Sequence, residues 1–379
     1  MATIMTVRFI PTPVVWSLQQ IIQQTTPASS DGAGSGGNGL GIDNDGDQII
    51  LGLPDRGADG ETIYFDRTGS TWTEREQFAS PASNDDHFGS SAALNDAGDI
   101  AVIGDRFADG PNNTGRAQIY TRSGSTWSLA QTFTGGSTND QMGITVAIDA
   151  SGTRAITNDE EFVRVFRDNG GGTWVDEQTI DVSFNNQAMA INAAGDTLVT
   201  AGGSNIEVWT RSGTTWTQQG SNITRAGFNS FSNIAITSDG DKIVAIDGTN
   251  DLVGTNHGAV GVWTRSGSVW SFDQEFGPNS ASDGDQFNRC SVSGDGTKIA
   301  IGAPSADNQG INDGAVQVFN LNGGTYQFAQ QLDQASATNN DLYGDKVVLS
   351  RDGNYLAVNC PFDDLNVSDA GSVYVWVLG

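Results

Sequence analysis

The sequence predicts an all-β fold, a seven-bladed β-propeller built from four-stranded antiparallel blades. Three observations predict it: a hairpin motif that recurs along the chain, a second and more aliphatic hairpin between successive copies, and a near-constant period. The aromatic residues that open the same strand of each copy are 42 to 56 residues apart. A fixed period of this length in a chain of 379 residues indicates one repeat array, not two or three separate domains.

The recurring motif is clearest at residues 258–274, GAVGVWTRSGSVWSFDQ. An alternating apolar stretch runs into a short Arg-Ser-Gly turn, and an aromatic residue then opens a second alternating stretch. Alternation on both sides of a glycine-containing turn is typical of a β-hairpin. The opening aromatics number the copies, and they predict seven repeats: Trp16, Trp72, Trp127, Trp174, Trp216, Trp270 and Tyr326.

A second hairpin lies between successive copies of this motif, for example at residues 88–105 and 343–361. Small and aliphatic residues run into an Asp-Gly, Ala-Gly or Ser-Gly turn, and a strand of Ile, Val, Leu and Ala follows. This composition predicts the more buried hairpin, so we name its strands A and B and the strands of the first motif C and D. The A strands are rich in Gly, Ala and Ser, which is expected of strands that crowd around an axis.

The two ends of the chain predict how the ring closes. Residues 14–20 form a D strand without a preceding C strand, and residues 372–378 form a C strand without a following D strand. We expect these segments to pair in one blade, because pairing satisfies both exposed strand edges. The predicted organisation is therefore an N-terminal extension at residues 1–13 and a single propeller at residues 14–379.

The charge balance argues against nucleic acid as a partner. The net charge is −27, with 37 Asp and 8 Glu against 15 Arg and 3 Lys, and such a surface repels phosphate backbones. The first 16 residues hold one Arg, two Pro and no sustained apolar run, which indicates neither a signal peptide nor a membrane span. Cys290 and Cys360 match no zinc or redox spacing, so we expect two buried free thiols.

The aliphatic hairpins contain two short motifs. One is present as Phe88-Gly89, Met142-Gly143 and Tyr343-Gly344, and the other as Gly302-Ala303-Pro304, with the variants Gly52-Leu53-Pro54 and Asn359-Cys360-Pro361. They resemble the FG and GAP elements of the FG-GAP repeat family, which includes the propeller of integrin α subunits. The resemblance covers the chain from Val14 onward and implies the propeller fold.

The same resemblance implies calcium in A–B turns of the form DxDxDGxxD. The best match is Asp43, Asp45 and Asp47, but Gln48 or Ile49 stands where the closing acid is needed. Calcium takes six to eight oxygen ligands, and a loop without its terminal bidentate carboxylate falls short of that number. We therefore predict a plain turn with no metal and no cofactor, and keep calcium at these three residues as the alternative.

Catalysis is not predicted. The two histidines, His87 and His257, lie in different repeats and outside any metal or nucleophile motif. A propeller lyase or glycosidase would need acids and a base that converge on the central channel. The A strands offer only Arg289, Asp345 and Lys346 for that role.

The B–C and D–A connections should emerge on one face, where they are long, variable and acidic except at residues 158–162 and 202–205. Variable loops on a rigid scaffold commonly bind partners. We therefore expect a non-enzymatic structural or adhesion protein that binds a protein or a host-surface receptor. With the missing export signal, this favours a virion component, such as a phage tail or capsid-associated protein, over a secreted or cell-surface adhesin. The candidate partner-binding residues are Asp105, Asp109, Asp251, Asp307, Asp313, Asp363 and Asp364.

Overall fold

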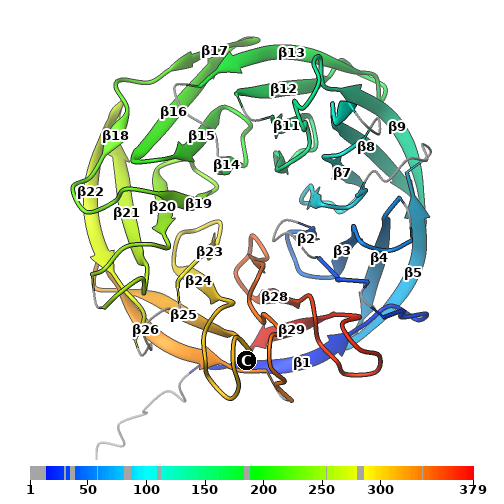
Figure 1. The fold of residues 1–379 in the computed structure, drawn as a ribbon. Helices are drawn as coiled ribbons and strands as arrows, with labels where there is room; N and C mark the ends of the chain where they lie inside the picture. Colours follow the sequence, from blue (N-terminus) through cyan, green and yellow to red (C-terminus); the bar gives the residue numbers. More distant parts are fainter. Residues whose placement is uncertain are drawn as a thin grey trace, which may run out of the picture.

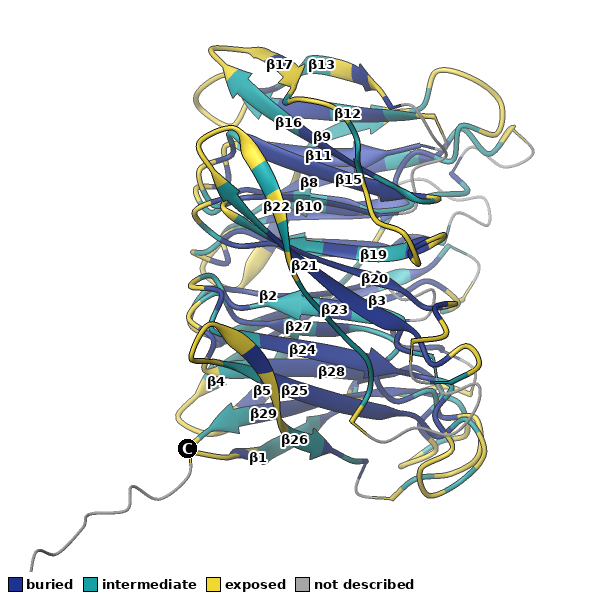
Figure 2. Cartoon of the chain, turned by 90° about the vertical axis from the view of Figure 1, so that its left-hand side faces the viewer, coloured by how far each residue is buried: buried dark blue, intermediate teal, exposed yellow. Residues whose placement is uncertain are grey.

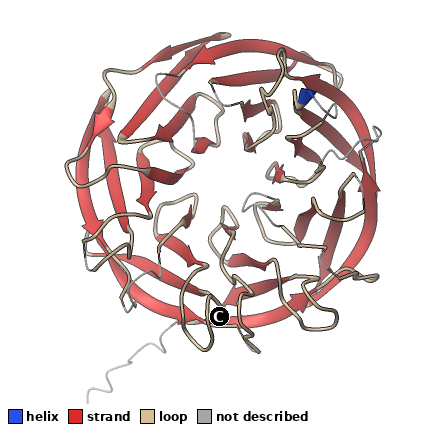
Figure 3. Cartoon of the chain, in the orientation of Figure 1, coloured by secondary structure: helices blue, strands red, loops and turns tan. Residues whose placement is uncertain are grey.

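The structure is a computed structural model that describes residues 14–29, 31–34, 39–57, 59–80, 87–108, 112–159, 161–182, 188–252, 254–279, 286–334 and 336–379. Seven antiparallel sheets stand in a ring around a central axis (Figure 1), and this confirms the predicted fold class. The regular secondary structure of the described residues is almost entirely strand (Figure 3). Each blade runs from strand A at the axis to strand D at the rim.

The first four blades follow the chain in order. Blade 1 comprises β2 (Leu40–Ile42), β3 (Gln48–Leu53), β4 (Glu61–Thr68) and β5 (Thr71–Ala79). Blade 2 comprises β6 (Ser91–Leu94), β7 (Ile100–Asp105), β8 (Arg116–Ser123) and β9 (Thr126–Thr134). Blade 3 comprises β10 (Val146–Ile148), β11 (Arg154–Asn158), β12 (Phe162–Asp168) and β13 (Trp174–Asp181). Blade 4 comprises β14 (Ala188–Ile191), β15 (Thr197–Gly202), β16 (Asn205–Ser212) and β17 (Thr215–Gln218), with the short β18 (Ile223–Thr224) also paired to β16.

The remaining three blades complete the ring. Blade 5 comprises β19 (Phe231–Ile236), β20 (Lys242–Asp247), β21 (Ala259–Ser266) and β22 (Val269–Phe276). Blade 6 comprises β23 (Arg289–Val292), β24 (Lys298–Ala303), β25 (Ala315–Asn322) and β26 (Thr325–Leu332). Blade 7 comprises β27 (Val347–Leu349), β28 (Tyr355–Cys360), β29 (Ser372–Leu378) and, from the other end of the chain, β1 (Trp16–Ile22).

The predicted closure of the ring is confirmed. β1 pairs antiparallel with β29, and the register runs from Trp16 opposite Leu378 to Ile22 opposite Val373. The strand begins two residues later than residues 14–20 suggest and extends to Ile22, while the predicted extension at residues 1–13 lies outside the described residues. Joining the two ends gives every C strand of the ring a D-strand neighbour.

Glycines of the FG and GAP elements allow neighbouring blades to approach closely. A Cβ atom on Gly302 would lie 2.0 Å from the backbone oxygen of Gly344 in the next blade, and one on Gly104 would lie 2.2 Å from that of Gly143. Real Cβ contacts are not that short, so positions 302 and 104 accept only glycine while Gly344 and Gly143 of the next blade lie this close. The motif is therefore a packing device between blades, and larger side chains form the core on either side of it.

A glutamine near the end of the recurring motif joins blades at the rim. The side chain of Gln274 accepts a hydrogen bond from the backbone N–H of Tyr326 at 2.7 Å and donates one to its carbonyl at 2.9 Å. Gln330 makes the same pair of bonds with Trp16, both at 2.9 Å, and so connects blade 6 to the strand from the N-terminus. Equivalent bonds join Gln20 to Trp72 and Gln178 to Trp216.

A second set of interblade bonds encircles the axis at the A–B turns. The second residue of each turn donates its backbone N–H to the carbonyl of its counterpart in the next blade, with a shift to Asp352 at the last step. The seven N···O distances lie between 2.8 and 3.3 Å. This inner ring runs from Asn44 to Asp96, Ala150, Ala193, Ser238, Gly294 and Arg351, and from Asp352 back to Asn44.

Candidate functional site

The two ends of the propeller differ in their connections. Short A–B and C–D turns cover one end, and the longer B–C and D–A connections cover the other, which we call the loop face (Figure 2). The B–C connections are short in blades 3 and 4, between β11 and β12 and between β15 and β16, as the sequence indicates. Long loops therefore surround most of the loop face and leave one low sector.

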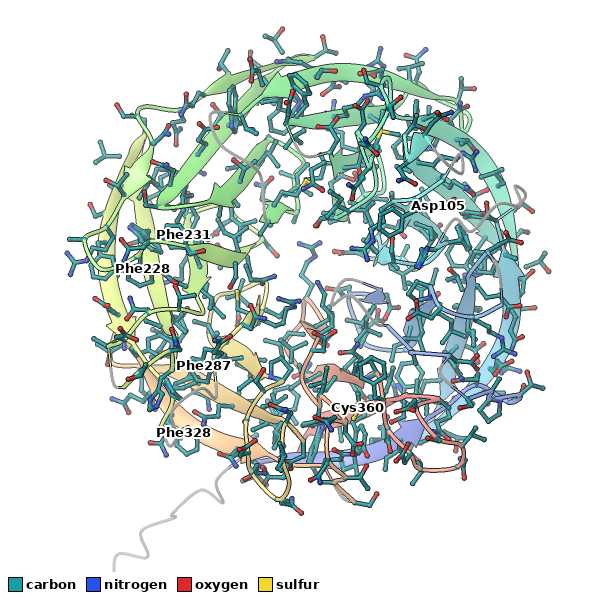
Figure 4. The ribbon with its side chains drawn as sticks, in the orientation of Figure 1. Asp105, Phe228, Phe231, Phe287, Phe328 and Cys360 are labelled. Carbon is teal, nitrogen blue, oxygen red and sulfur yellow. The ribbon has the colours of Figure 1, made fainter. Side chains whose placement is uncertain are left out.

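Three of the predicted partner-binding acids are buried beneath the loop face: Asp105, Asp313 and Asp363. Asp313 accepts three backbone N–H groups of its own loop at 2.9 to 3.0 Å. Asp363 accepts the hydroxyl groups of Ser372 and Tyr374, and burial raises its pKa. Asp105, labelled in Figure 4, lies 3.8 Å from the Arg116 guanidinium. These three carboxylates make contacts inside the protein and are not exposed at the loop face.

Three others are exposed at the tips of neighbouring B–C loops: Asp251 in blade 5, Asp307 in blade 6 and Asp364 in blade 7. Each accepts the backbone N–H of the residue five positions later, at 2.7, 2.7 and 2.8 Å. The donor residues all have a left-handed backbone, with φ of 53°, 50° and 52°. The three loops therefore share this closing hydrogen bond and the left-handed donor residue. Asp109 lies outside the described residues.

The same three loops expose apolar side chains that sequence reasoning missed. Leu252, Ile311 and Leu365 are 45%, 59% and 43% exposed. Leu252 and Leu365 directly follow Asp251 and Asp364, and Ile311 lies in the same loop as Asp307. They are the exposed large apolar side chains on the described part of the loop face. A single aliphatic residue in a polar loop gives no sequence signal. The presence of one in the corresponding loop of three consecutive repeats is the signal that the sequence offers. We call Asp251, Asp307, Asp364 and these three side chains the blade 5–7 tips.

The calcium candidate forms a compact acidic cluster. Ligand atoms of Asp43, Asp45 and Asp47 all lie within 4.8 Å of one another. Asp43 Oδ1 also accepts the backbone N–H groups of Asp47 and Gln48 at 3.0 and 3.1 Å. Turn residues of other blades make the same pair of bonds, including Asn95, Asp149 and Asn192. The position of Asp43 is thus explained by the turn alone, and the prediction of no metal stays a prediction.

Replacing Asp43 with Asn is expected to stabilise the protein at high pH. Burial, followed by the neighbouring Asp47, raises the pKa of Asp43 to about 8. The folded state therefore binds a proton that the unfolded state releases near pH 4, and the stability linked to that proton is lost as the pH rises toward 8. Asn95 shows that an amide can keep the turn bonds and also donate to the acid four residues on, at 2.8 Å to Asp99.

Urea denaturation at pH 4 and pH 9 measures this effect. The variant should match the wild type at pH 4 and exceed it at pH 9 by on the order of 2 kcal/mol. Excess chelator should leave the melting temperature of both proteins unchanged, because no metal-binding free energy is expected to be coupled to folding. A chelator-induced fall that calcium reverses in the wild type, but not in the variant, would show the calcium site instead.

The central channel holds a cavity of about 540 Å³ between the A strands. Near the loop face its walls carry Arg106, Arg289 and Lys346. The structure brings together the A-strand group that the sequence offers, with Arg289 Nη2 3.7 Å from Asp345 Oδ1. Burial, followed by repulsion from Arg289, lowers the pKa of Lys346 to about 8. Arg106 follows a B strand, so its sequence position alone gave no signal that it lines the channel.

One side chain crosses the channel at the A–B turns. Arg351 of blade 7 places its Nε 2.6 Å from Asp96 Oδ1 of blade 2, and its Nη1 lies 3.4 Å from the Ser238 hydroxyl of blade 5. The three residues all belong to the inner ring. Arg351 therefore obstructs the channel at this end.

The ring of seven four-stranded sheets makes the chain a seven-bladed β-propeller, with closely packed glycines between its blades. A model of the FG-GAP repeat family matches residues 270–319, which confirms the resemblance predicted from the sequence. That segment runs from the aromatic of blade 5 through the GAP element of blade 6. No curated protein matches the sequence. Among the described residues, no helix is both long and apolar enough to cross a membrane.

Solved structures share the architecture at low sequence identity. The β-propeller domain of Cps50 (Swd1) from Myceliophteria thermophila superposes with a TM-score of 0.64 at 9% identity, covering 96% of this chain and 100% of that one. A chain of Kuenenia stuttgartiensis hydrazine synthase superposes with a TM-score of 0.62 at 13% identity, covering 92% and 97%. Identities this low show the fold alone.

Proposed function

We propose that the protein is a non-catalytic binding propeller that holds a protein partner on the blade 5–7 tips. The observation that carries the proposal is the repeated pairing of an exposed acid with an exposed aliphatic side chain on three neighbouring blades. The hydrogen bond that closes each of these loops supports it, because a backbone restrained in this way loses less conformational entropy when a partner binds. The FG-GAP repeat architecture is consistent with a binding role.

The chemistry of the tips specifies the partner. Leu252, Ile311 and Leu365 favour an apolar contact area, since protein interfaces have apolar centres with polar rims. The exposed carboxylates beside them favour lysine, arginine or amide groups around that area, and the net charge of −27 attracts a basic partner over longer range. The low sector at blades 3 and 4 leaves room for a partner that extends beyond the tips.

The setting that we propose for this activity is a virion or an extracellular particle, with the propeller as a phage tail or capsid-associated protein. The support is the resemblance to the adhesive propellers of integrin α subunits and the presence of an exposed acidic and apolar binding surface. A secreted or cell-surface adhesin would use the same surface. Immunogold labelling of purified particles distinguishes the two settings.

Site-specific photocrosslinking tests the binding surface in the native particle or cell. A photoreactive residue at position 311 in blade 6 is expected to yield one discrete crosslinked protein. The matched control is position 269, where Val269 is 64% exposed at the C–D turn on the opposite end of the propeller. The crosslink from position 311 should decrease at least tenfold in the Asp307→Asn, Leu365→Ser double variant and should weaken at high salt.

The decisive comparison is between the two positions. A crosslinked protein obtained from position 269 and not from position 311 would place the interaction surface on the turn end and contradict the proposal. The double variant must keep the wild-type melting temperature, because both substitutions lie at exposed loop positions where changes cost little stability. A crosslink from position 311 that the double variant does not reduce would equally exclude the blade 5–7 tips.

A further inference from the structure

Basic residues gather at the loop-face end of the central channel, although the protein as a whole is acidic. The protein carries a net charge of −27, yet three of its 18 basic residues line the loop-face end of one cavity. Arg289 is paired with the Asp345 carboxylate at 3.7 Å, and it also donates hydrogen bonds to two backbone carbonyls. Arg106 lies in blade 2, whereas Lys346 lies in blade 7, so these cations face the cavity from separate walls.

Two buried donors in the same cavity have no acceptor within the described part of the chain. They are the Nε of Arg106 and the hydroxyl of Ser232, which lies in the inner strand of blade 5. The Arg106 guanidinium stacks on the Phe107 ring, with Cζ 4.6 Å from the ring centroid, and burial lowers its pKa. A buried polar group without a partner costs free energy, so the protein itself satisfies the donors of Arg106 and Ser232 incompletely.

The deeper lining of the cavity includes aliphatic residues. Aliphatic side chains of the inner strands, among them Leu94, Ile191 and Leu349, line it below the basic residues. A volume of about 540 Å³ is within the usual range for small-molecule sites, which combine apolar walls with a few polar groups. Because Arg351 crosses the other end, a ligand reaches this space from the loop face.

We infer that the central channel binds a small organic anion, with its carboxylate or phosphate group held by Arg106 and Lys346 and its apolar body against the inner strands. This site is separate from the blade 5–7 tips and does not depend on the function proposed for them. The acidic loops around it select against large polyanions, while a small anion passes between them into the basic end of the channel.

The electrostatics of Lys346 support this assignment. Burial, followed by repulsion from Arg289, lowers the pKa of Lys346 to about 8, while Cys290 and Asp345 act in the opposite direction. A bound anion would favour the charged form of the lysine and would relieve the repulsion between the two cations. Cys290 stays a thiol in this environment, because burial raises its pKa to about 12.

Isothermal titration of the full chain with octanoate tests the inference. At pH 7 and low salt, octanoate is expected to bind with one site, and octan-1-ol at least tenfold more weakly. Lys346→Gln and Arg106→Gln should each raise the octanoate Kd at least tenfold, and Lys346→Arg should restore most of the affinity. The matched control is Lys298→Gln, which removes the same charge from a strand residue that does not line the cavity and should leave the Kd unchanged.

The inference would be overturned by no octanoate binding to the wild type, by equal binding of octan-1-ol, or by equal losses in Lys298→Gln and Lys346→Gln. Melting temperatures separate binding defects from folding defects. If Lys346→Gln fails to fold, Arg106→Gln still decides the outcome, because Arg106 lies in a loop at the cavity wall. Arg106→Gln that folds and binds octanoate like the wild type would also overturn the inference.

Discussion

Removal of residues 1–22 is expected to yield a protein that aggregates or unfolds well below the melting temperature of the intact chain. β1 is the outer strand of blade 7, and its loss exposes the hydrogen-bonding edge of β29 along the whole strand. The buried Trp16 ring and its two hydrogen bonds to Gln330 would be lost at the same time. An exposed strand edge promotes pairing with other chains.

Size-exclusion chromatography and thermal denaturation measure the result. A truncation that removes only residues 1–13 is the control, since it retains every described strand and the full β1–β29 register. It should elute and melt like the intact protein. A monomeric protein without residues 1–22 that keeps the intact melting temperature would show that β1 does not close the ring.

Gly302→Ala is expected to destabilise the protein strongly for a single added methyl group, by about 3 kcal/mol or more. The new Cβ would lie 2.0 Å from the Gly344 oxygen, and that neighbour is backbone, so it cannot rotate away. Blades 6 and 7 would have to separate, which disturbs the core that contains Ala300, Val316 and Tyr343. Urea denaturation of the variant and the wild type measures the loss.

The control for this substitution is Gly323→Ala in the C–D turn of the same blade. Gly323 has φ of 59°, and a Cβ atom added to it would meet no other part of the chain within 4 Å, so alanine there introduces only backbone strain. The expected loss is on the order of 1 kcal/mol. Similar losses at the two positions would mean that the close approach of the FG and GAP glycines does not determine how the blades pack.

The strands were predictable because their physics is local. Period-two alternation on both sides of a glycine turn specifies a hairpin, and seven copies leave few topologies besides a closed ring. The A–B turns were also predictable. Asp43 occupies a position where, in every blade, a side-chain oxygen accepts a backbone N–H group of the turn. The closing strand was located to within two residues at each end.

The candidate sites were only partly predictable because they depend on loop conformation. Sequence reasoning grouped Asp313 with Asp307 as acids of one loop, but the chain folds the first inward as an acceptor for backbone groups and leaves the second outside. The approach of Arg106 and Lys346 to one cavity depends on how blades 2 and 7 are placed around the axis. No local pattern encodes that placement.

The inner ring of backbone hydrogen bonds has a mechanical consequence. Each A–B turn donates a hydrogen bond to one neighbouring turn and accepts one from the other. The ring of bonds is therefore continuous, and no blade lacks a bonded neighbour on either side. The rim glutamines join some of the neighbouring blades by a second set of hydrogen bonds, farther from the axis. A pull applied to the loops of blades 5–7 would therefore be distributed as circumferential tension over all seven blades, instead of peeling away the blade that is gripped.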